Sequence, residues 1–221
     1  MALNNMMNQT TKSDLMECIE SIVHPSHEAP LIDVKIVDGA TLVHTLDPKK
    51  SRIPVKTFQD YAKHVFLPYI SQMLQNVVRI DLVWDVYKKH SLKTLTRQAR
   101  GVPGNQLRIA NNTSIPINRK NFLRLEANKE GLFRLLATAL QEHPSPAGKT
   151  IISTYGDNAI SSPVLDLTAL NSTHEEADTR MLLHAFHALQ NGLSKVLLYA
   201  TDTDIIVITI AMPSFLRVCE L

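Results

Sequence analysis

The chain has 221 residues, of which 44% are hydrophobic and 20% are charged. This composition fits one globular domain with a sizeable core. The longest apolar run, residues 205–212, is far shorter than the roughly 20 residues that span a bilayer, and the N-terminus lacks the apolar block of a secretory signal. The two cysteines, Cys18 and Cys219, lie far apart, which excludes a C-x-x-C redox or zinc motif. We therefore expect a soluble, intracellular protein without a membrane partner.

Charge is distributed unevenly along the chain. The net charge is only +2, yet residues 88–124 contain nine Lys or Arg and no Asp or Glu. Because the whole chain has 23 basic and 21 acidic residues, the part outside this segment has 14 basic and 21 acidic residues. A basic segment within an otherwise acidic protein indicates a local contact with a polyanion such as a nucleic-acid backbone. A solvated basic face is the alternative.

Several apolar runs are predicted to be strands. Residues 31–37, 77–84 and 195–200 are strand-like, and each run is followed closely by an aspartate. Residues 150–154 are a weaker candidate, and we also expect the apolar run 205–210 to be a strand near an open edge of the sheet. Residues 1–30 are polar, and we expect a partly disordered leader with a short helix near residues 14–23.

Helical patterns lie between these strands. Residues 58–74 follow three-four apolar spacing, with a kink expected at Pro68, and residues 121–140 form a second helix. A third helix, residues 174–190, is expected to end at Asn191 and Gly192. The alternation predicts βαβ units and an α/β fold with a mostly parallel sheet. We expect one domain over residues 31–212, with the basic segment 88–124 inserted after the second core strand and a tail at 213–221.

The acidic residues that follow the strands form a candidate site. Functional groups of open α/β sheets gather beyond the carboxyl ends of the strands, and a helix with an acidic start is predicted nearby. The predicted group is Asp38, Asp85, Glu176, Asp178, Asp202 and Asp204. Grouped carboxylates repel one another unless cations neutralise them, and hard oxygen ligands favour Mg²⁺ or Mn²⁺.

Each member also has a purely local explanation. Thr173 and Glu176 have the spacing of a capping box, and Asp178 suits the dipole of a first helical turn. Asp38 and Asp202 suit turns that follow strands. The metal-site hypothesis therefore depends on the coincidence of strand-end carboxylates, an acidic helix start and a neighbouring basic segment.

Three motifs occur in a characteristic order. A strand leads into Asp38-Gly39; a second strand leads into Asp85 and a basic segment; and Glu176-Ala177-Asp178 at a helix start is followed by Gly192, a strand and Asp202-Thr203-Asp204. This order resembles the flap endonuclease, or XPG-type, group of the PIN-like nuclease superfamily. Asp178 stands where that family usually has Glu. Glu175 shares a helix face with Asp178 and stays an alternative to Glu176.

The resemblance implies a PIN-like three-layer fold and metal-dependent hydrolysis of phosphodiester bonds. It implies that the six carboxylates named above hold one or two Mg²⁺ or Mn²⁺ ions. It further implies a nucleic-acid partner, DNA rather than RNA, and a nuclear location. The implied phosphate-binding residues are Lys88, Lys89, Lys93, Arg97 and Arg100.

The chain also resembles animal proteins, linked to mobile elements, that share the blocks at residues 173–180 and 202–204. Members of the nuclease family usually continue with a further Asp and a helix-hairpin-helix element, so the resemblance implies a truncated C-terminus. One alternative function is therefore a catalytically inactive or truncated PIN-like module that binds nucleic acid or protein. Another is a zinc site of His174, His184 and His187, although the H-E-x-x-H signature is missing. The oligomeric state is left open.

Overall fold

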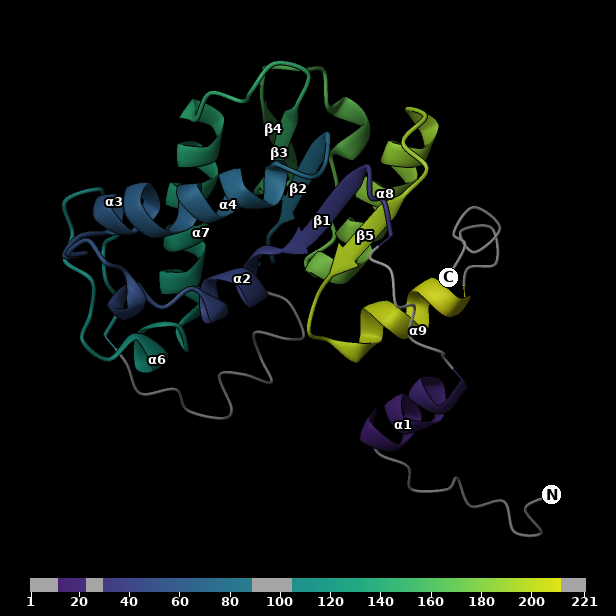
Figure 1. The fold of residues 1–221 in the computed structure, drawn as a ribbon. Helices are drawn as coiled ribbons and strands as arrows, with labels where there is room; N and C mark the ends of the chain where they lie inside the picture. The colour runs from purple at the N-terminus through teal and green to yellow at the C-terminus, as the bar shows by residue number, and fades with distance from the viewer. Residues whose placement is uncertain (1–11, 23–29, 89–104, 212–221) are drawn as a thin grey trace, which may run out of the picture.

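The computed structural model describes residues 12–22, 30–88 and 105–211 (Figure 1). In chain order, the first half contains α1 (Lys12–Ile22), β1 (Val34–Asp38), α2 (Gly39–Thr45), the 3-10 turn η1 (Pro48–Lys50), α3 (Phe58–Tyr61), the π-helical turn η2 (Ala62–Phe66), α4 (Leu67–Leu74) and β2 (Arg79–Val83). The second half contains α6 (Arg119–Phe122), α7 (Glu126–Glu142), β3 (Thr150–Tyr155), β4 (Asn158–Ser162), the 3-10 turn η3 (Thr168–Leu170), α8 (Ala177–Gln190), β5 (Val196–Tyr199) and α9 (Thr203–Ala211). None of the described helices is long and apolar enough to cross a membrane.

The strands form one sheet in the order β4-β3-β2-β1-β5. Four strands are parallel, and β4 pairs with β3 in the antiparallel direction. All five residues of β2 are buried, as expected for a central strand covered on both faces. The predicted α/β class with a mostly parallel sheet is confirmed.

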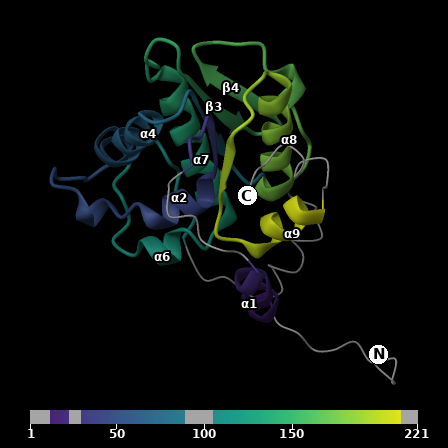
Figure 2. The ribbon, with the colours of Figure 1, turned by 45° about the vertical axis from the view of Figure 1, so that its right-hand side comes forward.

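Helices cover both faces of the sheet and produce three layers (Figure 2). On one face α2, η2, α4 and α7 enclose a core around Val37, Leu82 and Ile151. On the other face α8 and α9 pack against a cluster that includes Val34 and Ile36. Because alternate residues of β1 point to opposite faces, this strand supplies both cores.

The third predicted helix ends where its sequence indicates. Gly192 follows α8 with a φ of 80°, a left-handed conformation that glycine adopts without a steric penalty. The amide of Leu193 donates to the carbonyl of Ala188, and that of Gly192 donates to Leu189, each at 3.0 Å. This pair of hydrogen bonds is a Schellman motif, so the predicted stop is confirmed.

The prediction of a strand at residues 205–210 is wrong, because these residues lie in α9 (Thr203–Ala211). Asp202 accepts a hydrogen bond from the amide of Asp204 at 3.1 Å, which caps the helix start. Ile205 is 3% exposed and packs with α8 in the second core. The β-branched residues favour strands only weakly, and this cap and packing outweigh that preference.

Two predicted helices are divided. The segment 58–74 comprises α3, η2 and α4, and Pro68 lies in the first turn of α4. Proline cannot donate to the preceding turn, and the π-helical turn Ala62–Phe66 lies immediately before α4. The segment 121–140 divides into α6 and α7. Strand β4 was not predicted from the sequence; it joins β3 through a two-residue turn of Gly156, at φ 57°, and Asp157.

The first residue of α2 lies against the indole of Trp84. A Cβ atom added to Gly39 would lie 2.1 Å from Cε3 of Trp84. The indole cannot easily move, because its Nε1 donates to Ser153 Oγ at 2.9 Å and its ring stacks on Phe133 with 4.6 Å between centroids. Glycine therefore sets the approach of α2 to the end of β2.

We predict that Gly39→Ala lowers the free energy of unfolding by about 1–3 kcal/mol, because the added methyl group displaces a buried aromatic ring. Urea denaturation followed by circular dichroism measures the change. Gly131→Ala is the control, since its methyl group would meet only the side chain of Ile109, at 3.1 Å or more. An equal or larger loss in the control would contradict the role assigned to Gly39.

Candidate metal centre

The candidate centre lies at the carboxyl ends of three neighbouring strands. Strand β1 lies between β2 and β5 and is parallel to both. The helices that join β1 to β2 cover one face of the sheet, whereas α8, which precedes β5, covers the other. The chain therefore reverses its winding direction at β1. Ligand sites of open α/β folds lie at such switch points, beyond the carboxyl ends of the strands.

Asp38 ends β1 and caps α2. Its Oδ1 accepts from the amide of Ala40 at 2.8 Å, and its Oδ2 accepts from the hydroxyl of Thr41 at 2.6 Å. Thr41 Oγ1 also lies 3.0 Å from the hydroxyl of Thr201, which follows β5. Because the Thr41 proton is donated to Asp38, Thr201 donates to Thr41. A chain of hydrogen bonds thus joins the ends of β1 and β5.

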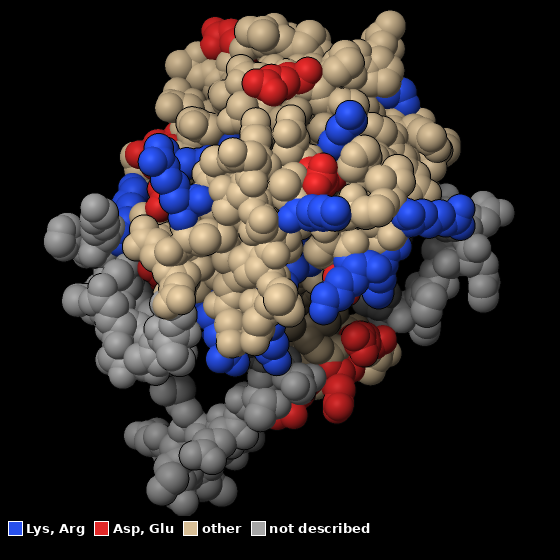
Figure 3. All heavy atoms as spheres, turned by 90° about the vertical axis from the view of Figure 1, so that its left-hand side faces the viewer, with Lys and Arg blue, Asp and Glu red and all other residues tan. Residues whose placement is uncertain are grey.

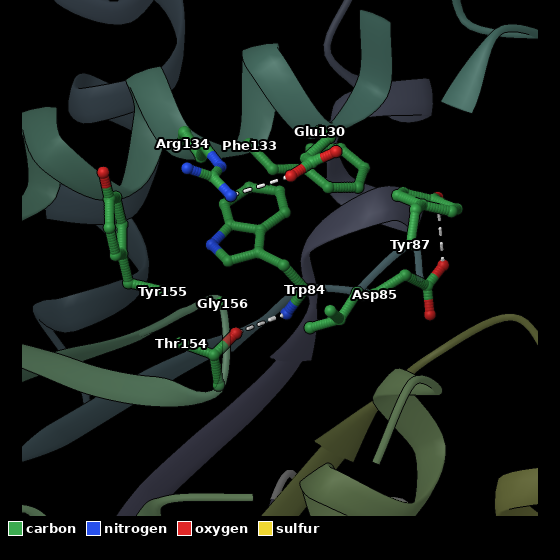
Figure 4. Close-up of a pocket in the computed structure, with 10 residues that line it drawn as sticks. Trp84, Asp85, Tyr87, Glu130, Phe133, Arg134, Thr154, Tyr155 and Gly156 are labelled. Atoms are coloured by element: carbon green, nitrogen blue, oxygen red, sulfur yellow. Dashed lines mark hydrogen bonds and ion pairs between the residues drawn. The ribbon is translucent and has the colours of Figure 1, made fainter. Parts of the chain in front are cut away.

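Asp85 lies two residues beyond β2 and contacts the start of α8. Its Oδ1 accepts from the amide of Ala177 at 3.0 Å, and the amide of Val86 donates to the carbonyl of Glu175 at 2.8 Å. The hydroxyl of Tyr87 donates to Oδ2 at 3.4 Å, and Figure 4 marks this contact between the two side chains. The adjoining hollow on the Trp84 side is only about 40 Å³ and is too small for a nucleotide.

Three carboxylates from two elements converge beside these groups. Asp178 lies in the first turn of α8, and Asp202 and Asp204 lie at the start of α9. One oxygen from each of the three lies within 4.8 Å of the others. Oxygens that share one Mg²⁺ at 2.0–2.1 Å lie at most about 4.2 Å apart. The three side chains therefore need only a small adjustment to hold a hard divalent cation.

The electrostatics place Asp38 and Asp85 close to the same group. Partial burial, then Asp202, Asp38, Asp85 and Asp204 in decreasing order, raise the pKa of Asp178 to about 6. Burial is also the main cause that raises the pKa of Asp38, with Asp85 adding to it. Five of the six predicted carboxylates are therefore neighbours, and their mutual repulsion is the condition that a bound cation relieves.

Glu176, the sixth predicted residue, has a different position. It is the N-cap residue of α8, and its side chain does not cap the helix. The capping-box alternative with Thr173 is wrong, because the helix begins at Ala177 and Asp85 accepts from that residue's amide. Capping by a residue distant in sequence replaces the local motif. Neither Glu176 nor Glu175 belongs to the group of three that lies within 4.8 Å.

Of the predicted phosphate-binding residues, only Lys88 lies in the described part of the chain. Its Nζ donates to the carbonyl of Thr173 at 2.7 Å and lies 3.9 Å from Asp157 Oδ1. This ammonium group therefore links the loop before α8 to the turn between β3 and β4. The other four lie outside the described residues: Lys89, Lys93, Arg97 and Arg100.

A buried ionic network that the sequence analysis missed joins β2 to α8. Asp81, fully buried in β2, accepts from Arg79 at 2.5 and 2.7 Å and from His184 Nδ1 at 2.7 Å. Burial raises the pKa of Asp81, but the hydrogen bonds from His184 and Arg79 outweigh it and hold the pKa below its ordinary value. Arg79 also contacts His187 Nδ1 at 3.0 Å. Two histidines of the zinc alternative therefore pair with this network.

Arg180 adds a second buried charge, on α8. Its side chain is 1% exposed, and its three guanidinium nitrogens have no hydrogen-bond partner among the described residues. Burial lowers the pKa of Arg180, and the nearby carboxylates Asp157 and Asp85 oppose that shift. The guanidinium therefore offsets part of the negative charge of Asp85 and Asp157.

Comparisons of the chain with protein-family models, with curated proteins and with solved structures found no match. The resemblance to the flap endonuclease group therefore depends on the motifs alone and stays a prediction.

We predict that Asp178→Asn stabilises the metal-free protein at neutral pH. Asp178 binds its proton more tightly in the folded chain, where its pKa is about 6, than at its ordinary pKa of 3.8. The stability that this tighter proton binding contributes is therefore complete below about pH 4 and is lost as the pH rises through about 6. Because the group is partly solvated, screening reduces the expected gain to about 1 kcal/mol. Chemical denaturation in EDTA at about pH 7 and about pH 4 measures this gain, and an equal gain at the two pH values would contradict the explanation.

We predict that Asp81→Asn costs about 3–5 kcal/mol of stability, because it leaves the buried charge of Arg79 without its counter-ion. Asp166→Asn, at an exposed aspartate that accepts from Thr168, should cost at most about 1 kcal/mol. The midpoints of urea unfolding compare the two variants. Similar losses in both would show that the buried network contributes little.

Proposed function

We propose that the protein hydrolyses phosphodiester bonds in nucleic acid with the help of Mg²⁺ or Mn²⁺. The observation that carries this proposal is the convergence of Asp178, Asp202 and Asp204 within 4.8 Å. Asp38 and Asp85 lie beside them at the switch point of the sheet. The order of motifs that resembles the flap endonuclease group supports the same function, and a nuclear location belongs to the proposal.

The exposure of the centre favours a polymeric substrate. Asp202 and Asp204 are exposed, and Asp178 is half-buried. Small-molecule sites usually enclose most of their ligand in a concave pocket, whereas a long phosphodiester chain can lie across an open surface. The carboxylates alone would repel such a chain, so binding of the scissile phosphate requires the cation.

The residues divide the chemical work between them. Asp178, Asp202 and Asp204 would hold the cation, and Asp38 and Asp85 lie where their charges act on the same place. A divalent cation held there supplies Lewis acidity at the scissile phosphate and neutralises the carboxylates. Asp178, whose pKa burial and then the neighbouring carboxylates raise to about 6, would release its proton to solvent on holding a cation, because a cation favours the carboxylate form. Metal affinity should therefore rise with pH through about 6.

Cleavage assays test the proposal directly. Labelled single-stranded, duplex and flap substrates of DNA and RNA are incubated with Mg²⁺, Mn²⁺ or EDTA. We expect products only with the metal ions, and a loss of about a hundredfold or more in Asp202→Asn and Asp204→Asn. Glu142→Gln, at the exposed end of α7, is the charge-matched control and should keep full activity.

Metal binding provides a separate measurement. Mn²⁺ should raise the Tm of the wild-type protein and of Glu142→Gln, but not of Asp202→Asn, because only a ligand that prefers the folded state stabilises it. Stabilisation by the ion together with nucleic-acid binding but no products would favour the alternative of a non-catalytic binding module. Products formed equally in EDTA would rule out the metal-dependent mechanism.

A further inference from the structure

Folding joins two basic segments that are distant in sequence. Residues 48–56 contain four Lys or Arg and no acidic residue, and residues 105–124 contain four more, also without an acidic residue. The amide of Ile115 donates to the carbonyl of Lys56 at 2.9 Å, and Thr57 forms a β-bridge with Ser114. The positive charge of one segment is thus added to that of the other.

A groove of about 860 Å³ lies between these segments, and its lining includes His44, Lys49, Arg119 and Lys120 together with one acidic residue, Asp47. Lys and Arg side chains are spread across the middle of the face shown in Figure 3. Lys49 and Lys120 are exposed, and neither forms an ion pair among the residues that the structure describes. Their ammonium groups are therefore available to an external anion.

Arg119 fixes the wall of the groove. Its guanidinium donates to the carbonyls of Val43 and Leu46, at the end of α2, and to the hydroxyl of Tyr61 at 2.9 Å. It also lies 5.0 Å from the centroid of the Tyr61 ring. These partners are neutral, and three cations in the lining, Lys49, Arg119 and Lys120, outnumber the single carboxylate of Asp47, so the groove is both rigid and net positive.

Helix α2 connects the groove to the acidic centre. Asp38 caps its start, and His44 lies in its last turn and lines the groove. The seven residues of α2 span about 10 Å, which is about three base-pair steps at 3.4 Å each. The pKa of His44 is affected by charges from both regions, because burial and then Arg119 of the groove lower it while Asp38 of the acidic centre raises it. The groove therefore begins within a few nucleotides of the centre.

We propose that this groove binds the phosphate backbone of a nucleic-acid strand whose scissile phosphate lies at the carboxylates. The inference rests on the proposed function, and it assigns Lys49, Arg119 and Lys120 to phosphates a few steps from the scissile one. An acidic peptide could pair with the same cations. The nearby carboxylates favour a nucleic acid, because a polyphosphate chain can reach a cation held by them and the groove at once. Ile117, which is 93% exposed in the groove wall, offers an apolar surface to a base.

The test measures affinity without cleavage. Fluorescence anisotropy in EDTA compares a labelled single-stranded oligonucleotide bound to the wild type, to Lys49→Gln/Lys120→Gln and to the matched control Lys63→Gln/Lys195→Gln. Both double variants remove two exposed lysines, and the control pair does not line the groove. Circular dichroism melts should show all three proteins folded. We expect the groove variant to lose about tenfold in affinity and its salt slope to fall by about 1.4, while the control changes less than about twofold.

Three outcomes would overturn the inference. The groove variant could bind like the wild type, both variants could lose affinity equally, or a labelled polyglutamate peptide could bind the wild type as tightly as the oligonucleotide. Because the titration contains EDTA, its result does not depend on whether the carboxylates can hold a metal ion. A groove variant that loses affinity, beside a wild type that never cleaves, would uphold the groove and reject hydrolysis. Metal-dependent cleavage with unchanged affinity in the groove variant would do the reverse.

Discussion

Aspartates that hold the first amide groups of three helices bring the candidate centre together. Asp38 accepts from the second residue of α2, Asp85 from the first residue of α8 and Asp202 from the second residue of α9. Each carboxylate is stabilised by backbone N–H groups and by the positive end of a helix dipole. This interaction reduces the repulsion that would otherwise prevent anionic side chains from gathering at one edge of a sheet.

The compensation is incomplete at Asp178, which lies within the acidic group. Partial burial and then the remaining repulsion raise its pKa to about 6. A centre of this kind is folded without a cation and is stabilised further when a cation binds. Its ligands are therefore preorganised and still bind the ion favourably. Inside the protein, the buried guanidinium of Arg180 offsets part of the negative charge of Asp85 and Asp157.

The strands and the aspartates that follow them could be predicted because they depend on local pattern. Apolar runs that end in an aspartate indicate buried parallel strands, and the carboxyl ends of such strands must share one edge. The helix at 203–211 could not be predicted in the same way, since its residues are β-branched and only the cap at Asp202 and packing against α8 decide the outcome. Strand β4 is short and polar, and its one clear signal is the Gly156-Asp157 turn.

The buried network and the groove could not be predicted from the sequence, because each depends on contacts between distant residues. Asp81 and His184 are 103 residues apart in the sequence, so no periodicity relates them. A charged pair at alternate positions of an otherwise apolar central strand does indicate that buried partners must exist, because an unpaired buried charge is too costly. Likewise, the basic segment 48–56 is visible in the sequence, but only its contact with residues 113–115 forms a cationic surface with the second segment.

The same geometry shows at which carboxylates a substitution changes the metal centre alone and at which it also lowers the stability of the fold. Asp85 holds the first amide of α8, and its neighbour Val86 donates to Glu175, so a substitution at Asp85 would loosen the start of a core helix as well as the centre. Asp38 is joined to α2 and to Thr41 in a similar way. Asp202 caps α9, whose Ile205 packs in the second core, so its replacement also loosens that helix. Asp204 is exposed and supplies only its backbone amide to that cap, which Asp204→Asn keeps. Loss of activity at Asp204 can therefore be assigned to the metal centre, whereas loss at Asp38, Asp85 or Asp202 combines lost metal affinity with lost stability.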